Sequence, residues 1–302
     1  LIHTGHQGEV RCKLRAASSV WWPGLATAIS HLVANCPQCA EHRLQPVEPL
    51  MATATPERPW HTIGVDFFQH NRTNWLVVVD YYSRYPEVIT MSSTTANKLV
   101  DTLHSLFSRH GVPAVVRSDN GPQFASEEFR TFSRQLNFQH VTSSPHYPQS
   151  NGEAERMVRT VKDMLKKNAT TRQLYDALLA YRATALPHCR YSPAELLMGR
   201  KVKTPLPQLP SQLLPDAVNH DAFQAADAQQ KAKSTRQYDL RHRTRDLPPL
   251  VPGDTVTSAA GPSKEKATVI AVAPEPRSLV IRTQSGAVVR RNRRHLRKHP
   301  NA

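Results

Sequence analysis

Three runs rich in β-branched and aromatic residues, close together near the middle of the chain, constrain its fold most. They read HTIGVDFFQH, NWLVVVDYY and EVITM, and short polar turns join them. Such runs predict an antiparallel meander. Helices expected at 95–109, 126–136 and 152–167 then alternate with strands expected at 114–119 and 138–143. Because the connections are short, the pattern predicts a mixed sheet flanked by helices.

Two aspartates occupy this sheet at places where functional groups gather. Asp66 lies in the first predicted strand and Asp119 ends the fourth, and neighbouring parallel strands would bring them together. Glu155, at the start of the following helix, could complete the cluster. Clustered carboxylates need cations, and hard oxygen ligands suit Mg²⁺ or Mn²⁺. Two ions roughly 3.5 to 4 Å apart could support an in-line phosphoryl displacement, which spacing alone leaves as one hypothesis among several.

The helix that carries Glu155 opens with a second glutamate, Glu153. Either could simply offset the helix macrodipole, at roughly 0.3 to 1 kcal/mol each. Residues two apart on a helix point about 200° apart, so only one can face a given site. Steps of four, seven and eleven from Glu155 lead to Arg159, Lys162 and Lys166. This basic stripe would suit an anionic polymer beside a metal-binding acid.

A second candidate metal site lies at the start of the chain. His3, His6, Cys36 and Cys39 form the pattern H-x2-H-x29-C-x2-C, and two close pairs of such ligands can build a zinc tetrahedron. A module of about 45 residues has a small core, so the metal would supply folding energy. The alternatives are chance and a redox CxxC, which lacks its βαβ setting here.

Between the two ligand pairs, we expect a helix that begins near Pro23. Its predicted buried residues are Leu25, Ile29, Leu32 and Val33. Cys12, His31 and Cys189 are expected to be ordinary packing or surface residues.

The charge of the chain favours a polyanionic partner. Lys and Arg outnumber Asp and Glu by 39 to 24, for a net charge of +15. The excess is concentrated in the run VVRRNRRHLRKHP near the end, which we interpret as a basic tail that contacts phosphates. A solubilising or nuclear-targeting tail is the alternative. The predicted contacts include Arg290, Arg291, Arg293 and Arg294.

The rest of the chain divides by composition. Four prolines between residues 205 and 215 predict a stiff linker, residues 216–245 are polar and helix-prone, and short strands from LVPGDTV onward predict a small barrel of about 50 residues. No apolar run long enough to span a membrane, roughly 18 residues or more, and no signal peptide occurs, so we expect a soluble, intracellular chain without a membrane partner. The start at Leu1 suggests a piece of a longer polypeptide. The expected domains are residues 1–45, 56–200, 201–245 and 246–302.

The chain carries eight short motifs that together resemble the integrase of Ty3/gypsy-type LTR retrotransposons, which is related to retroviral integrases. They are GHQG, VWWPG, CPQC, IGVDFF, VVVDYYSRYPEV, SDNGPQF, YPQSNGEAER and YSPAELLMGR. The resemblance implies an HHCC zinc domain, an RNase H-like core and an SH3-like barrel. It maps the family's D…D-x35-E triad onto Asp66, Asp119 and Glu155. It also implies DNA contacts at Asn120 and Asn151, and at Arg159 and Lys162. The two histidines depart from it, because they stand only three apart.

The resemblance implies a nuclear, multimeric integrase that reaches the nucleus from a cytoplasmic particle. It would trim the 3′ ends of element DNA and then join them to target DNA, with double-stranded DNA as partner, chromatin as a further one, and Mg²⁺ or Mn²⁺ and Zn²⁺ as cofactors. Two alternatives stay open. One is a domesticated DNA- or chromatin-binding protein without activity. The other is a ribonuclease H, which shares the core fold but explains neither HHCC nor the barrel.

Overall fold

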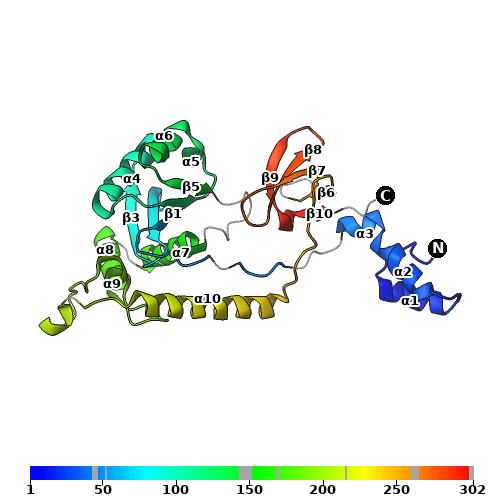
Figure 1. The fold of residues 1–302 in the computed structure, drawn as a ribbon, viewed down its shortest axis with the longest axis horizontal. Helices are drawn as coiled ribbons and strands as arrows, with labels where there is room; N and C mark the ends of the chain where they lie inside the picture. Colours follow the sequence, from blue (N-terminus) through cyan, green and yellow to red (C-terminus); the bar gives the residue numbers. More distant parts are fainter. Residues whose placement is uncertain are drawn as a thin grey trace. The chain divides into compact units, whose positions relative to one another are not determined.

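The computed structural model describes residues 1–42, 47–51, 53–142, 152–167, 170–214, 216–259 and 265–298, with the backbone alone for 40–42 and 152–155. The chain divides into two compact units, Leu50–Tyr238 and Leu1–Pro49 together with Asp239–Ala302. Figure 1 shows the elements of each. In the part of the chain described, no helix combines the length and the apolar composition that a membrane span requires.

A five-stranded mixed sheet forms the centre of the Leu50–Tyr238 unit. Its strands are β1 (Thr62–His70), β2 (Thr73–Asp80), β3 (Pro86–Met91), β4 (Val115–Ser118) and β5 (Gln139–Thr142). Their order is β3-β2-β1-β4-β5. The first three strands are antiparallel, whereas β4 runs parallel to β1 and β5 runs parallel to β4. The predicted meander and the parallel strands that follow it are therefore confirmed.

Helices cover both faces of this sheet. The elements in chain order are α4 (Ala96–His110), α5 (Pro122–Ala125), α6 (Glu127–Gln135), α7 (Gly152–Lys167), α8 (Thr171–Ala183), α9 (Pro193–Met198) and the 3₁₀ turn η2 (Pro210–Leu213). The three predicted core helices are confirmed to within a residue or two, and α5 is an additional short helix. The hydroxyl of Ser126 caps α6 by accepting from the Phe129 amide.

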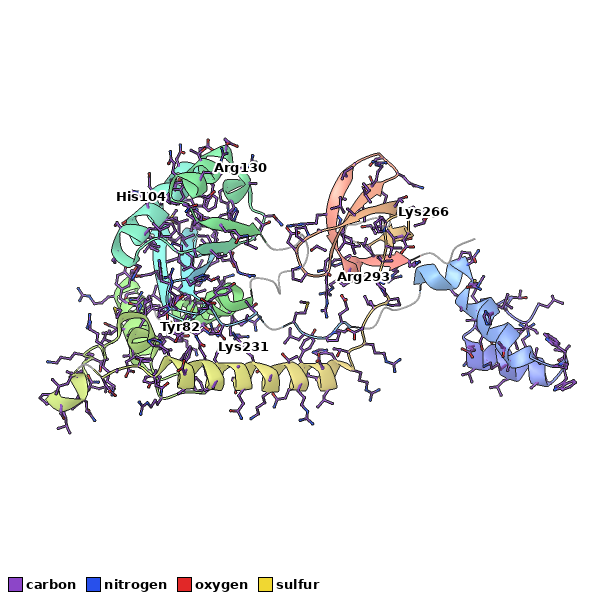
Figure 2. The ribbon with its side chains drawn as sticks, viewed as in Figure 1. Tyr82, His104, Arg130, Lys231, Lys266 and Arg293 are labelled. Carbon is purple, nitrogen blue, oxygen red and sulfur yellow. The ribbon has the colours of Figure 1, made fainter. Side chains whose placement is uncertain are left out.

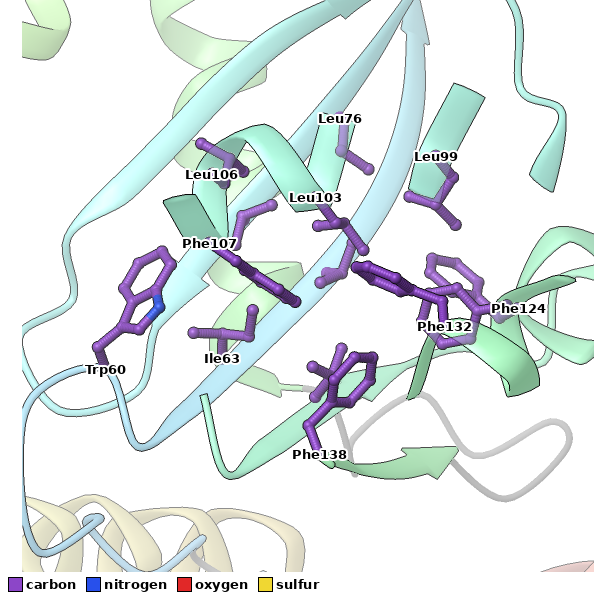
Figure 3. Close-up of a cluster of buried hydrophobic side chains, with 14 of the residues drawn as sticks. Trp60, Ile63, Leu76, Leu99, Leu103, Leu106, Phe107, Phe124, Phe132 and Phe138 are labelled. Carbon is purple, nitrogen blue, oxygen red and sulfur yellow. The ribbon is translucent and has the colours of Figure 1, made fainter. Parts of the chain in front are cut away.

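Two hydrophobic clusters fix which face each helix covers. Ile63 and Val65 of β1 pack with α4, α5 and α6 in an aromatic-rich cluster (Figure 3). On the opposite face, Phe68 of β1 and Val77 of β2 pack with α7 and α8. Side chains alternate along a strand, so Asp66 shares the face of Phe68, the face that α7 covers.

A buried carboxylate explains the DYYS part of the central motif. Asp80 is fully buried at the end of β2 and accepts bonds from the backbone amides of Trp60, Tyr82 and Ser83 and from the Ser83 hydroxyl. Burial raises its pKa, although these four bonds act in the opposite direction. Asp80 therefore has a structural role in the turn between β2 and β3.

The long helix α10 (His220–His242) is polar, as predicted, and packs on the core through few side chains. Phe223 lies against Tyr82, and Asp227 is 2% exposed. The Asp227 carboxylate contacts Arg84 at 3.1 Å and Lys231 at 3.0 Å. Figure 2 labels Lys231 on α10. Burial alone would raise the pKa of Asp227, but Arg84, Thr55 and Lys231 lower it below its ordinary value.

The N-terminal module consists of α1 (Glu9–Ala17), α2 (Leu25–Ala34) and α3 (Pro37–His42). Ile29 and Val33 of α2 are buried against Cys12 and Ala16 of α1. The prediction that Leu32 is buried was wrong, because its side chain is 50% exposed. The buried stripe of α2 runs through positions 25, 29 and 33, and Leu32 lies beside it.

A second five-stranded sheet, all antiparallel, forms the C-terminal barrel. Its elements are β6 (Thr255–Ser258), β7 (Glu265–Val272), β8 (Ser278–Thr283), β9 (Val288–Asn292), the 3₁₀ turn η3 (Arg293–His295) and β10 (Leu296–Lys298), in the order β10-β6-β7-β8-β9. Its core includes Val256, Val269, Ile281 and Leu296. The interpretation of residues 288–298 as a tail was therefore wrong, since this run supplies the last two strands of the barrel.

Candidate active site and metal centres

The pairing of β1 with β4 aligns the first two candidate acids. Thr62 pairs with Val115, Ile63 with Val116 and Gly64 with Arg117. Asp66 follows two residues later in β1, and Asp119 follows two residues later in the chain, one residue beyond the end of β4. If the register continues past the end of β4, both residues fall on the same face of the sheet. Asp66 is half-buried and Asp119, the first residue after β4, is exposed. The register thus makes neighbours of the strand that carries Asp66 and the strand that leads into Asp119.

The loop after β4 holds the Asp119 carboxylate. Its Oδ1 accepts a hydrogen bond from the Gly121 amide at 2.9 Å. A Cβ at position 121 would lie 3.0 Å from that oxygen and 2.6 Å from Nε2 of Gln123. The glycine therefore lets the loop close tightly around the acid, and the exposed Asn120 lies within this loop.

Helix α7, which carries the third candidate acid, Glu155, covers the face of the sheet that carries Phe68. Met157, Val158 and Val161 pack with Phe68 and Val77, the latter being the β2 partner of Asp66. Glu155 lies in the first turn of α7, just before the residues of this helix that pack on the sheet. The side chains of Glu153 and Glu155, and the whole of Asn151, lie outside the described residues.

The basic stripe of α7 lies beside its buried face. Arg159 and Lys166 are exposed, and the Lys166 ammonium lies 3.6 Å from the Asp163 carboxylate. Lys162 is half-buried, with its ammonium 5.3 Å from the centroid of the Phe68 ring. The stripe therefore presents cations along the side of the helix that begins at Glu155.

The four predicted zinc ligands converge. One ligand atom from each of His3, His6, Cys36 and Cys39 lies within 4.8 Å of all the others. Nε2 of His3 is 3.2 Å from the Cys39 sulfur, and Nδ1 of His6 is 3.4 Å from the Cys36 sulfur. Tetrahedral zinc with bonds of about 2.0 to 2.3 Å requires edges of ~3.6 Å. The arrangement fits zinc.

The close spacing of the two histidines is accommodated by a turn. His6 has a left-handed backbone, with φ of 48°, and its amide donates to the His3 carbonyl at 3.1 Å. The other ring nitrogen of His3 lies 3.5 Å from the sulfur of Cys12, a buried residue of α1. Cys12 thus packs behind a ligand, in agreement with its expected packing role.

The C-terminal arginines differ in what they can contact. Arg293 is 8% exposed, and its guanidinium donates to the carbonyls of Pro248 and Leu296 (Figure 2). The prediction that Arg293 contacts DNA is therefore corrected, because its donors hold the barrel together. Arg290 forms an ion pair with Glu275, and Arg291 donates to the Arg290 carbonyl at 3.2 Å. Arg294 has an exposed side chain.

A buried serine and a half-buried histidine next to the site were not predicted. Ser118 directly precedes Asp119, and its hydroxyl lies 2.9 Å from Nε2 of His140 on β5. Burial lowers the pKa of His140 to about 4. A histidine in a short strand carries no sequence signal for this contact, which depends on the register of β4 with β5.

Comparison with known proteins agrees with this organisation. Residues 1–45 match the family described as integrase zinc binding domain, and residues 56–148 match the integrase core domain. The chain is 38% identical over 213 residues, or 67% of its length, to the uncharacterized protein K02A2.6 of Caenorhabditis elegans. It is 28% identical over 208 residues, 64% of its length, to the Pro-Pol polyprotein of feline foamy virus. It is 29% identical over 176 residues, 55% of its length, to the transposon Tf2-3 polyprotein of Schizosaccharomyces pombe.

These matches cover only 17%, 18% and 13% of the three relatives, so the chain corresponds to a small part of each. Among solved structures, a simian T-cell lymphotropic virus intasome chain in complex with PP2A regulatory subunit B56 gamma has a TM-score of 0.66 at 18% identity. The match covers 98% of this chain and 97% of that one. This likeness shows that the three-part fold is shared.

The family matches also bear on the cofactors. The zinc-binding match and the converging ligands together indicate structural zinc in residues 1–45. The core-domain match implies a divalent metal cofactor, and a face that carries two aspartates supplies the oxygen ligands such an ion prefers. The two family matches and the polyprotein relatives show that the chain belongs to the integrase family that retroviruses and LTR retrotransposons share.

Proposed function

We propose that this integrase processes the 3′ ends of retrotransposon DNA and joins them to target DNA at one metal-dependent site. The observation that supports the proposal is the parallel pairing of β1, which carries Asp66, with β4, which leads into Asp119, on a sheet with one face covered by α7. Asp66 and Asp119 would hold the divalent ions, and Glu155 would complete the ligand set. Bound there, such ions supply an activated attacking oxygen and stabilise the leaving oxygen.

The residues around this face would position the DNA. Arg159 and Lys166 present exposed cations along α7, next to Glu155. The Lys162 ammonium lies over the Phe68 ring of β1. Contacts of this kind fix a phosphate backbone without reading its bases. We assign Asn120 and Asn151 to the same role near the reacting ends.

The proposal includes a multimer, because two DNA ends must be joined in concert. The relative with a TM-score of 0.66 is an intasome chain, which supports assembly on DNA. We also place the site of action in the nucleus, with chromatin as the target. The net charge of +15 supports a polyanionic partner of this kind.

A strand-transfer assay tests the reaction. The full chain is incubated with Mn²⁺, a labelled duplex carrying the terminal sequence of the element, and a target plasmid. The DNA that flanks the coding region supplies that terminal sequence. We expect shortened 3′ ends and products joined to the target, and both should disappear in Asp66→Asn and Asp119→Asn.

Two other outcomes would contradict the proposal. DNA binding without either product would indicate a domesticated, non-catalytic protein. Cleavage confined to the RNA strand of an RNA–DNA duplex would indicate a ribonuclease H. A hybrid duplex of the same sequence serves as the matched substrate, and unchanged DNA binding in both aspartate variants shows that they are folded.

A further inference from the structure

A part-buried pair of hydrogen bonds links His140, Ser118 and the backbone of Asp119. The Ser118 hydroxyl donates to the Asp119 backbone carbonyl at 2.8 Å and lies 2.9 Å from Nε2 of His140. A hydroxyl has a single proton to donate, and the Asp119 carbonyl can only accept. The His140 imidazole must therefore carry its proton on Nε2 and donate it to Ser118.

Aromatic side chains fix the His140 ring. Its centroid lies 4.8 Å from that of Phe129 and 6.2 Å from that of Phe124, both members of the cluster in Figure 3. Ser118 is fully buried. These ring contacts restrict the His140 imidazole, so its hydrogen bond can set the direction of the Ser118 hydroxyl from the neighbouring strand.

The position of these hydrogen bonds matters for the Asp119 backbone, because β4 ends at Ser118. Asp119 is the first residue beyond the strand, where the β-ladder no longer holds the backbone. Ser118 lies two residues after Val116 on β4, and His140 of β5 is the register partner of Val116. All three side chains therefore lie on the face that packs against α4 and α6. Ser118 and His140 lie on the side of the sheet opposite the candidate metal site and can act on it only through the Asp119 backbone.

We propose that His140 and Ser118 are positioning residues that orient Asp119 for metal binding. The Ser118 hydroxyl fixes the Asp119 carbonyl from behind, while the Gly121 amide fixes its Oδ1 in front. Partners of metal-binding carboxylates tune affinity in this way, and their loss typically costs about 10- to 100-fold. The inference rests on the proposed function, because it takes Asp119 as a metal ligand.

Binding of Mn²⁺ to the full, zinc-loaded chain tests the inference without catalysis. Titration followed by electron paramagnetic resonance should show about 10-fold weaker binding in Ser118→Ala and in His140→Phe. His140→Gln keeps a donor and should recover most of the affinity. Ser108→Ala is the matched control, since it removes a hydroxyl-to-carbonyl bond on the exposed side of α4.

The outcomes separate this inference from its alternatives. If Ser118→Ala and His140→Phe bind Mn²⁺ as tightly as the wild type, the inference is overturned. The pair would then have a structural role only, whether or not the melting temperature falls. Equal losses in His140→Gln and His140→Phe would also overturn the inference. Normal Mn²⁺ binding by Asp119→Asn would show that the proposed metal site itself is wrong, and the inference would fall with it.

A measurement on the unmodified chain remains decisive if a variant fails to fold. Nitrogen-15 shifts of the His140 ring report which nitrogen carries the proton. We expect the proton on Nε2. A proton on Nδ1 alone would mean that Ser118 donates to the ring instead of the Asp119 carbonyl, which would overturn the inference.

Discussion

Removal of the Asp227 carboxylate should destabilise the core more than substitution of any exposed residue of α10. The side chain of Asp227 is 3% exposed, that of Arg84 10% and that of Lys231 17%. Thr55 also donates to Asp227, at 2.5 Å. In Asp227→Ala, two nearly buried cations lose their shared counter-charge, and breaking such a pair costs about 3 to 5 kcal/mol.

Urea unfolding followed by tryptophan fluorescence can measure this loss. Trp60 and Trp75 of the core are 4% and 5% exposed, whereas Trp21 and Trp22 of the N-terminal module are 82% and 42% exposed. The change in fluorescence therefore reports mainly on the core. With a slope of about 2 kcal/mol per molar urea, Asp227→Ala should lower the midpoint by roughly 1.5 to 2.5 M.

Two further variants make this prediction sharp. Asp221→Ala removes an exposed carboxylate from the first turn of α10, where the helix dipole contributes only about 0.3 to 1 kcal/mol. Addition of Arg84→Met to Asp227→Ala removes one uncompensated cation and should restore part of the stability. A midpoint shift in Asp227→Ala no larger than in Asp221→Ala would refute the reasoning.

Three other predictions concern the zinc module, the half-buried His140 and the barrel. Chelation or Cys36→Ser should remove zinc and reduce helical circular dichroism while the core still melts normally, whereas Cys189→Ser should retain zinc. Because the pKa of His140 falls from 6.5 to about 4 on folding, the unfolded chain binds more protons between these values. Stability should then drop as the pH is lowered through that window, by roughly 1 to 2 kcal/mol after allowance for solvent screening, and His140→Gln should flatten the profile. Arg293→Ala should cost the barrel about 2 to 3 kcal/mol in thermal unfolding, while Arg294→Ala should leave stability unchanged and reduce the salt slope of DNA binding by about 1. Equal stability of the last two variants would contradict the structural role of Arg293.

The central sheet was predictable because its strands bury both faces. Continuous apolar runs marked β1 and β2, and the alternation of helices and strands after β3 implied parallel neighbours for β1. That order sets the strand of Asp66 beside the strand that leads into Asp119. The zinc ligands were equally predictable, since two short pairs with a helical spacer leave few other arrangements.

The errors arose where charge obscured the strand pattern. In β9 and β10, arginines occupy both inward and outward positions, so no apolar alternation marks the strands. Arg293 is buried because backbone carbonyls satisfy its donors, which composition cannot reveal. The Asp227 cluster joins residues 143 positions apart, and the His140 contact requires the register of β4 with β5. Such long-range contacts need the folded structure.

Strand transfer by the Glu155→Gln and Glu153→Gln variants tests the central claim most directly. The two substitutions remove the same charge from the same helical turn, two residues apart, so differences in helix stability should stay within about 0.3 to 1 kcal/mol. We expect Glu155→Gln to abolish both 3′-end processing and strand transfer while DNA binding persists, and Glu153→Gln to retain both activities. Turnover by Glu155→Gln, with loss in Glu153→Gln, would contradict the assignment of the triad.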